Sequence, residues 1–414
     1  MALALMGLSV WDGRGDAVSA EPLTLRVDDG RIVALGTAPE LSSDAEGIDC
    51  AGAFAVPGLI DGHVHMTLDP EIGPPAKQLA VARDVLHVAM VERARAMLLA
   101  GITTARDLGG GEWSEFLLRD RIAAGLVPGP RLLCAGQPVT SPDGHCHFWG
   151  GEARTPDELR AVVARQLAHD ADCIKVMATG GVMTKGTKPR EAQFDADEIR
   201  VVVEAAAASG RLVAAHCHSA PGIRNASEAG VRTVEHCSWS GEDGFGSDFD
   251  PDVLAGMAGR ELWISATPNP SWGKRLEKEG QPTPFATRMK ACMRAAREAG
   301  VPMIASTDAG IPGVRHDVLP RMLPVFAEYA GLSPVEALRA VTCEVAKAIG
   351  LERVTGRLAD GLSADVLIVD GNPLDDLSAL QSVRHVVARG RCFSARGRVV
   401  SERGAAPLGA TGGL

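Results

Sequence analysis

Short apolar runs alternate with longer amphipathic segments through the middle of the chain. The runs are rich in β-branched residues and are short, which favours buried strands. Eight segments are predicted as strands: residues 56–65, 101–110, 130–137, 173–181, 211–218, 231–237, 262–269 and 301–308. The intervening segments are rich in Ala, Glu and Arg and predict helices, as at residues 85–100, 155–169, 195–210 and 287–300. Thr155 and Asp195 each precede an acidic first turn, which is typical of a helix start.

This alternation predicts an α/β fold, a (β/α)8 TIM barrel. Eight strand–helix units are what a closed parallel barrel requires. An open doubly wound sheet is the competing architecture, but it accounts less well for the number of strands. No GxGxxG follows the first predicted strand to support it.

The two ends of the chain have a different pattern. Residues 23–36 and 386–400 read as β-hairpins around Asp-Gly and Arg-Gly turns, and residues 364–374 add a strand without a long helix after it. We therefore expect both ends to build one small β-sandwich beside the barrel. The expected organisation is a β-sandwich of residues 1–57 with 355–403, a barrel of residues 58–354, and a flexible tail of residues 404–414.

Composition and charge narrow the class of protein. The 414 residues include 46% hydrophobic and 23% charged residues, which is ordinary for a soluble globular enzyme. The formal net charge of −10 argues against a nucleic-acid partner. The nine cysteines lack CxxC pairing, no segment has the length of a membrane span, and the N-terminus lacks the basic residues of a signal peptide. These features predict a cytoplasmic protein with reduced thiols and no membrane association.

Lys175 lies in an apolar run, where an ammonium is costly unless it is neutralised or chemically changed. A lysine that snorkels to water is the simpler reading of the run alone. Strand alternation, however, places Cys173, Lys175 and Met177 on one face, and Ile174 and Val176 on the face toward the helices. Lys175 is therefore expected to point into the barrel.

Other polar residues end the predicted strands, where a parallel barrel carries its functional groups. The six candidates are His63, His65, Lys175, His216, His236 and Asp308. His63 and His65 share one face of their strand and can reach one ion. The HxH pattern alone is weak, because the chain has three such pairs. The convergence of six such groups on the strand ends is what favours a metal site.

Several motifs resemble the metal-dependent amidohydrolase superfamily over nearly the whole chain. They are PGLIDGHVH, GITTARDLGG, IKVMATGG, AAHCHS, VEHC, STDAG and ADVLIVDGNPL. The run IKVMATGG is the most selective of them, and it is similar to the fourth strand of the branch that contains Xaa-Pro dipeptidases and related carboxypeptidase-like enzymes. The resemblance implies a hydrolase that acts on C–N bonds.

The resemblance also implies a binuclear centre. His63, His65 and Asp308 would bind one divalent ion, and His216 and His236 the second, with His218 as a rival to His216. Lys175 would bridge both ions as a carbamate formed with carbon dioxide. Zinc suits four imidazoles with carboxylate oxygens best, although manganese, iron or cobalt also fit.

By the same resemblance, a metal-bridging hydroxide attacks an amide-type carbonyl, and Asp308 is the catalytic general base and then acid. The expected substrate is a dipeptide, an N-acyl amino acid or a related small molecule or short peptide. The same site could instead hydrolyse a cyclic amide, lactone, carbamate or other ester-like molecule. A non-catalytic scaffold is a third alternative, but loss of ligands would be its signature.

The loops after the strands are expected to bind substrate. His145 matches the histidine on the third loop of dipeptidase relatives. Those relatives have EHG followed by a tyrosine, whereas this chain has VEHCSW, with Trp239 near the tyrosine position. Arg315, on the loop after the eighth strand, is a further candidate. A homo-oligomer is expected by resemblance only.

Overall fold

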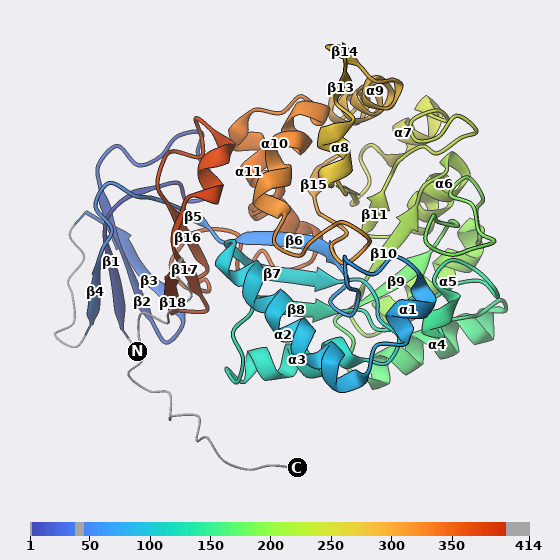
Figure 1. Cartoon of the computed structure of the whole chain (residues 1–414), viewed down its shortest axis with the longest axis horizontal. Coiled ribbons are helices and arrows are strands. Elements are labelled where there is room, and N and C mark those ends of the chain that lie inside the picture. Colours follow the sequence, from blue (N-terminus) through green and yellow to red (C-terminus); the bar gives the residue numbers. More distant parts are fainter. Residues whose placement is uncertain (1, 38–44, 395–414) are drawn as a thin grey trace.

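The computed structural model describes residues 2–37 and 45–394. Figure 1 shows a β-sheet region on one side of the molecule and alternating strands and helices over the rest. Strands from the two ends of the chain lie together in this sheet region, although they are far apart in sequence.

Both ends of the chain contribute to one eight-stranded sheet. Its strands are β1 (Leu3–Val10), β2 (Leu23–Asp28), β3 (Arg31–Gly36), β4 (Glu46–Asp49), β5 (Phe54–Pro57), β16 (Val366–Val369), β17 (Val383–Ala388) and β18 (Arg391–Ser394). Their order is β18-β17-β16-β5-β1-β2-β3, with β4 paired to β1. The antiparallel pair of β5 and β16, with Val366 opposite Pro57, connects the two ends. Apolar side chains such as Leu25, Ile32 and Ile368 form a separate core here.

The two hairpins expected from the sequence are present. β2 and β3 meet around Asp29 and Gly30, and β17 and β18 meet around Arg389 and Gly390. All four turn residues have positive φ, as a two-residue type I′ turn requires. Residues 395–400 of the second predicted hairpin and the tail 404–414 lie outside the described residues, so the domain limits stay a prediction.

Eight parallel strands fill the centre of the chain. They are β6 (Leu59–Val64), β7 (Ile102–Asp107), β8 (Arg131–Cys134), β9 (Cys173–Met177), β10 (Leu212–Cys217), β11 (Thr233–His236), β12 (Trp263–Ala266) and β15 (Met303–Ala305). β6 to β8 form one sheet, and β9 to β12 with β15 form another. All strand pairs within these two sheets are parallel.

The expected closed ladder of eight strands is not continuous. In the described residues, isolated bridges of Val64 with Ala309 and of Val139 with Val176 join the two sheets. Backbone hydrogen bonds from Asp308 N–H to the His63 carbonyl and from Val139 N–H to the Lys175 carbonyl lie at these seams. The interruption has a local cause, because β15 and β8 end early and the chain beyond them adopts irregular backbone.

Helices connect the parallel strands and flank them. They are α1 (Pro75–Leu79), α2 (Arg83–Leu99), α3 (Ser114–Ala123), α4 (Pro156–Ala168), α5 (Ala196–Ala207), α6 (Ala220–Ala229), α7 (Pro251–Met257), α8 (Pro270–Lys274), α9 (Pro284–Glu298), α10 (Leu319–Ala330), α11 (Pro334–Ala340) and α12 (Cys343–Ala348). Short elements are the 3₁₀ helices η1 (His147–Trp149) and η2 (Leu377–Gln381) and the hairpin of β13 (Glu277–Lys278) and β14 (Gln281–Pro282). Thr155 and Asp195 cap α4 and α5 with capping boxes, as predicted. Within the described residues, every helix is too short or too polar to cross a membrane.

The two faces of β9 follow the predicted alternation. Ile174 and Val176 belong to the main apolar core that includes the helices. Cys173 belongs to a small separate cluster, and Met177 lines the central cavity. Lys175 also lines that cavity and is 1% exposed, so it points inward as expected.

Candidate metal centre

The polar residues that end the parallel strands gather around one cavity of about 660 Å³. The cavity is lined by all six residues expected to ligate metals: His63, His65, Lys175, His216, His236 and Asp308. They come from β6, β9, β10, β11 and the segment after β15. The parallel strands thus deliver these side chains to one end of the fold.

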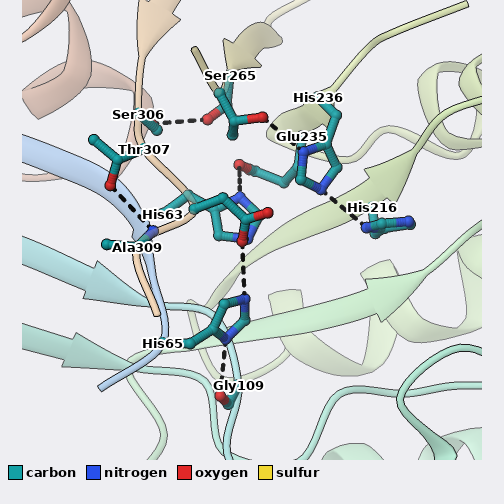
Figure 2. A network of polar contacts seen from close by, with 12 residues as sticks. His63, His65, Gly109, His216, Glu235, His236, Ser265, Ser306, Thr307 and Ala309 are labelled. Atoms are coloured by element: carbon teal, nitrogen blue, oxygen red, sulfur yellow. Dashed lines mark hydrogen bonds and ion pairs between the residues drawn. The ribbon is translucent and has the colours of Figure 1, made fainter. Parts of the chain in front are cut away.

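The first cluster consists of His63, His65 and Asp308. The Nε2 atoms of both histidines lie 3.3 Å from the same Asp308 oxygen, Oδ1. His63 Nδ1 donates to Glu235 Oε2 at 2.9 Å, and His65 Nδ1 donates to the carbonyl of Gly109 at 3.0 Å (Figure 2). A carbonyl and a carboxylate can only accept, so in the neutral imidazoles both Nε2 atoms carry lone pairs. Three electron-rich atoms therefore converge with no proton between them.

The second cluster consists of His216, His218 and His236. His216 Nε2 donates to the Gly180 carbonyl at 3.2 Å, which leaves its Nδ1 as a lone pair 3.0 Å from His236 Nε2 (Figure 2). His236 Nδ1 contacts Thr267 Oγ1 at 2.8 Å, and His218 Nδ1 contacts Ser238 Oγ at 2.7 Å. Both His216 and His218 remain positioned to join His236 around one ion.

Lys175 stands out because its Nζ has no hydrogen-bond partner. Burial lowers the pKa of Lys175, although the charges of Glu235 and Asp308 oppose this shift. An unpaired buried amine is costly, so its presence requires something that the protein side chains do not supply. A lowered pKa also increases the fraction of neutral amine, which is the nucleophilic form.

A buried ionic network supports the first cluster from below. Glu235 is fully buried and accepts hydrogen bonds from His63, Arg106 and Thr233 at 2.9, 2.9 and 2.5 Å. Arg106 also donates to the Gly62 carbonyl, next to His63. Such outer partners orient a ligating histidine and set its tautomer. Sequence analysis did not identify this pair, although VEHC places Glu235 beside His236.

Two of the side chains reach the cavity through left-handed backbone. His236 has φ of +65° and Asp308 has φ of +59°. Non-glycine residues in this region are strained and cluster at functional sites. On β11, the regular alternation directs Glu235 inward, and the positive φ then directs His236 toward the same cavity.

Burial keeps three of the imidazoles neutral, whereas at His65 burial lowers the pKa but the hydrogen bond and charge of Asp308 outweigh it and raise the pKa. Burial lowers the pKa of His63, His216 and His236 well below the usual histidine range. Neutral imidazoles are the form that binds metals. The converging lone pairs, the carboxylate of Asp308 and the unpaired Lys175 amine therefore fit a centre with divalent cations.

Of the residues expected to bind substrate, His145 lies in the cavity. Its ring is 4.6 Å from that of His216, and its Nδ1 has no partner. Burial lowers the pKa of His145 to about 3. The ring packs on the backbone of Gly181, where a Cβ would lie 2.3 Å from it. This close approach explains the second glycine of the IKVMATGG run.

Trp239 and Arg315 are not at the cavity, contrary to the expectation. Trp239 is 2% exposed and packs edge-to-face on Phe249 in the apolar core. Its backbone has φ of +50°. Arg315 is exposed and pairs with Asp317 at 3.2 Å. Neither residue lines the cavity.

Other cavity residues were not singled out from the sequence. Phe245 lies on the loop after β11, Trp272 lies in α8 after β12, and Met183 lies on the loop after β9. The loops themselves were expected to shape the pocket. Which of their side chains turn inward has no periodic signal, because loops lack regular alternation.

Comparisons with known proteins agree with this arrangement. The profile of the Amidohydrolase family matches residues 54–393. Ochratoxinase of Aspergillus niger is 29% identical over 377 residues, which covers 83% of this chain and 76% of the relative. Imidazolonepropionase of Rubrobacter xylanophilus is 26% identical over 400 residues and covers 86% of each chain.

The solved structures lead to the same family. The crystal structure of a Xaa-Pro dipeptidase with methionine bound in its active site has a TM-score of 0.82 and 27% identity. The match covers 95% of this chain and all of that one. Relatives of the dipeptidase branch are thus among its structural neighbours. The chain therefore belongs to the amidohydrolase family and is a hydrolase that acts on C–N bonds.

Proposed function

We propose that this protein is a binuclear metal-dependent hydrolase that cleaves an amide-type bond in a dipeptide, an N-acyl amino acid or a related small molecule. One ion is held by His63, His65 and Asp308, and the second by His216 and His236. Two divalent ions, most suitably zinc, match this set of imidazole and carboxylate ligands. The expected homo-oligomer stays part of the proposal.

The observation that carries the proposal is the unpartnered amine in a cavity that is also lined by two clusters of histidines. Lys175 Nζ is buried without a partner, while the ligand atoms of His63, His65 and Asp308 point at a common position. His216 and His236 present a second pair of atoms 3.0 Å apart. Without cations, the Lys175 amine has no hydrogen-bond partner, and the neutral His63 and His65 each direct a lone pair at a carboxylate oxygen.

Carboxylation of Lys175 resolves both problems. The neutral amine adds to carbon dioxide, forms a new N–C bond and releases one proton. The product is an anion with two oxygens, which suits a position between two cations. Burial of Lys175 favours this reaction because it lowers the pKa of the amine.

The remaining roles in catalysis, ligand orientation and substrate binding belong to residues of the chain. When bound, divalent ions would lower the pKa of a water molecule to roughly 7 and polarise a carbonyl. Among the described residues, Asp308 is the one carboxylate that lines the cavity, so it would accept the proton and pass it to the leaving nitrogen. Glu235 holds the orientation of His63, and His145 offers its unpaired Nδ1 to the substrate.

A lysine variant tests the centre directly. Lys175→Met removes the unpartnered amine and the carbamate, so the bound metal should fall below two ions per chain. Amide hydrolysis should fall more than about 100-fold, which exceeds the loss typical of an outer-sphere partner. The metal-free variant should also be more stable than metal-free wild type, by about 1–3 kcal/mol, because an unpaired buried group is gone.

Metal analysis, a hydrolysis panel and urea denaturation measure these effects. Lys185→Met, on the exposed loop after β9, is the matched control and should behave as wild type. Reactivation of the apoprotein by zinc should require bicarbonate. Wild-type turnover in metal-loaded Lys175→Met would refute the bridging role.

A cyclic amide is the second candidate substrate. The relationship to imidazolonepropionase favours it, and the same centre could also act on lactones or carbamates. A panel of Xaa-Pro dipeptides, N-acyl amino acids and cyclic amides separates the two candidates by their values of kcat/KM.

A further inference from the structure

One wall of the cavity is aromatic. The ring of His218 stacks on Phe245 with centroids 5.2 Å apart and an interplanar angle of 16°. Trp272 lines the same cavity from α8. These residues come from the ends of β10, β11 and β12, so the wall stands beside the second histidine cluster.

The wall is held rigidly from behind. Phe285 lies edge-on to Trp272 at 5.4 Å and 6.4 Å from Phe245. Tyr329 packs against Trp272 at 4.9 Å and donates its hydroxyl to the Trp272 carbonyl at 3.0 Å. Trp272 is only 5% exposed. A supported aromatic surface of this kind loses little entropy when a ligand binds to it.

The cavity lining also carries few charged side chains. Among the described residues that line the cavity, Lys175 and Asp308 are the only Lys, Arg, Asp or Glu side chains, and both belong to the proposed metal centre. The remaining lining is apolar or neutral, with Met177, Met183 and Ile311 facing the space. Substrate affinity must then come largely from apolar contact and a few neutral hydrogen bonds.

We propose that Phe245 and Trp272 form a specificity subsite that selects amide substrates carrying a flat aromatic group beside the scissile bond. The inference rests on the proposed function and narrows its substrate class. An aromatic ring that stacks on Phe245 gains contact energy beyond its buried area. A methyl group in the same position leaves part of the wall without contact.

Matched amides test the subsite. The series contains phenyl and methyl versions of both the acyl part and the amine part, assayed with metal-loaded enzyme. Wild type should prefer one phenyl member over its methyl counterpart by about tenfold or more in kcat/KM. Phe245→Leu, which keeps apolar bulk and removes the ring, should reduce this ratio toward one.

Phe249→Leu is the matched control, because Phe249 lies on the same loop but packs on Trp239 outside the cavity. This control should keep the wild-type ratio. An equal ratio in wild type and Phe245→Leu, or an equal loss in both variants, overturns the subsite.

A binding measurement separates this inference from the proposed function. Calorimetry compares phenylphosphonate with methylphosphonate, which share an anionic head and differ by the ring. Wild type should bind the phenyl compound about tenfold more tightly, and Phe245→Leu should not. Preferential binding without any amide hydrolysis would support the subsite and refute the proposed function. Rapid amide hydrolysis without either preference would do the reverse.

Discussion

At the residue scale, the site is built from buried polar side chains that the protein supplies with only part of their hydrogen bonds. His63 and His65 each donate Nδ1–H to a protein acceptor, and their Nε2 atoms face the same oxygen of Asp308. Lys175 has no partner at all. Buried polar groups are nearly always satisfied in folded proteins. Two of the unsatisfied buried atoms, Lys175 Nζ and His145 Nδ1, lie in the cavity where cations and substrate are expected.

Asp308→Asn tests the proton transfer at this scale. The amide keeps the size of the side chain but cannot accept a proton at neutral pH, so turnover should fall by about 10²–10⁴-fold with much of the metal retained. Steady-state kinetics and metal analysis on the same preparation measure this.

Asp317→Asn is the control, because Asp317 lies on the same loop in a surface pair with Arg315. It should keep the wild-type rate. Wild-type turnover by metal-loaded Asp308→Asn would remove Asp308 from the mechanism.

At the scale of elements, local sequence signals account for the scaffold and for part of the site. Alternation on β9 places Lys175 inward because successive side chains of a strand point to opposite faces. It does not explain β11, where Glu235 and His236 are neighbours yet both serve the same end of the fold. The positive φ of His236 makes this possible. No residue pattern in VEHC predicts that backbone conformation.

Thr155→Ala tests the capping of α4. The Thr155 side chain accepts from Glu158 N–H, and the Glu158 carboxylate accepts from the Thr155 N–H in return. Loss of the cap should lower the free energy of unfolding by about 1 kcal/mol. Urea denaturation measures it, and Thr155→Ser should retain the stability. Turnover should not change, because α4 begins away from the cavity; a slower variant would contradict this separation.

At the scale of the whole molecule, Asp365 connects the sheet of the chain ends to the parallel strands. Its buried carboxylate accepts from Arg131 at 3.0 Å, from Thr355 at 2.8 Å and from the Arg389 N–H at 2.8 Å. Arg131 begins β8, whereas Asp365 precedes β16. The contact therefore couples segments separated by more than two hundred residues.

Asp365→Ala should destabilise the whole chain. It leaves Arg131 without its carboxylate in a largely buried position, at a cost of about 3–5 kcal/mol. The comparison is Asp370→Ala, which breaks the solvent-exposed pair with Arg384 and should cost less than about 1 kcal/mol. Thermal and urea unfolding of both variants measure the difference. Equal stabilities would show that the junction contributes little.

The sequence alone determined the parallel strands, the hairpins and the inward direction of His63, His65 and Lys175, because these depend on alternation and turn chemistry within a few residues. Only the tertiary structure decided the partners of those side chains. Glu235 reaches His63 from another strand and is itself bound by Arg106, Trp239 turns into the core rather than the cavity, and Phe245 and Trp272 become the cavity wall. The direction of a loop side chain and the seams between the two parallel sheets depend on packing between distant segments, which no local period encodes.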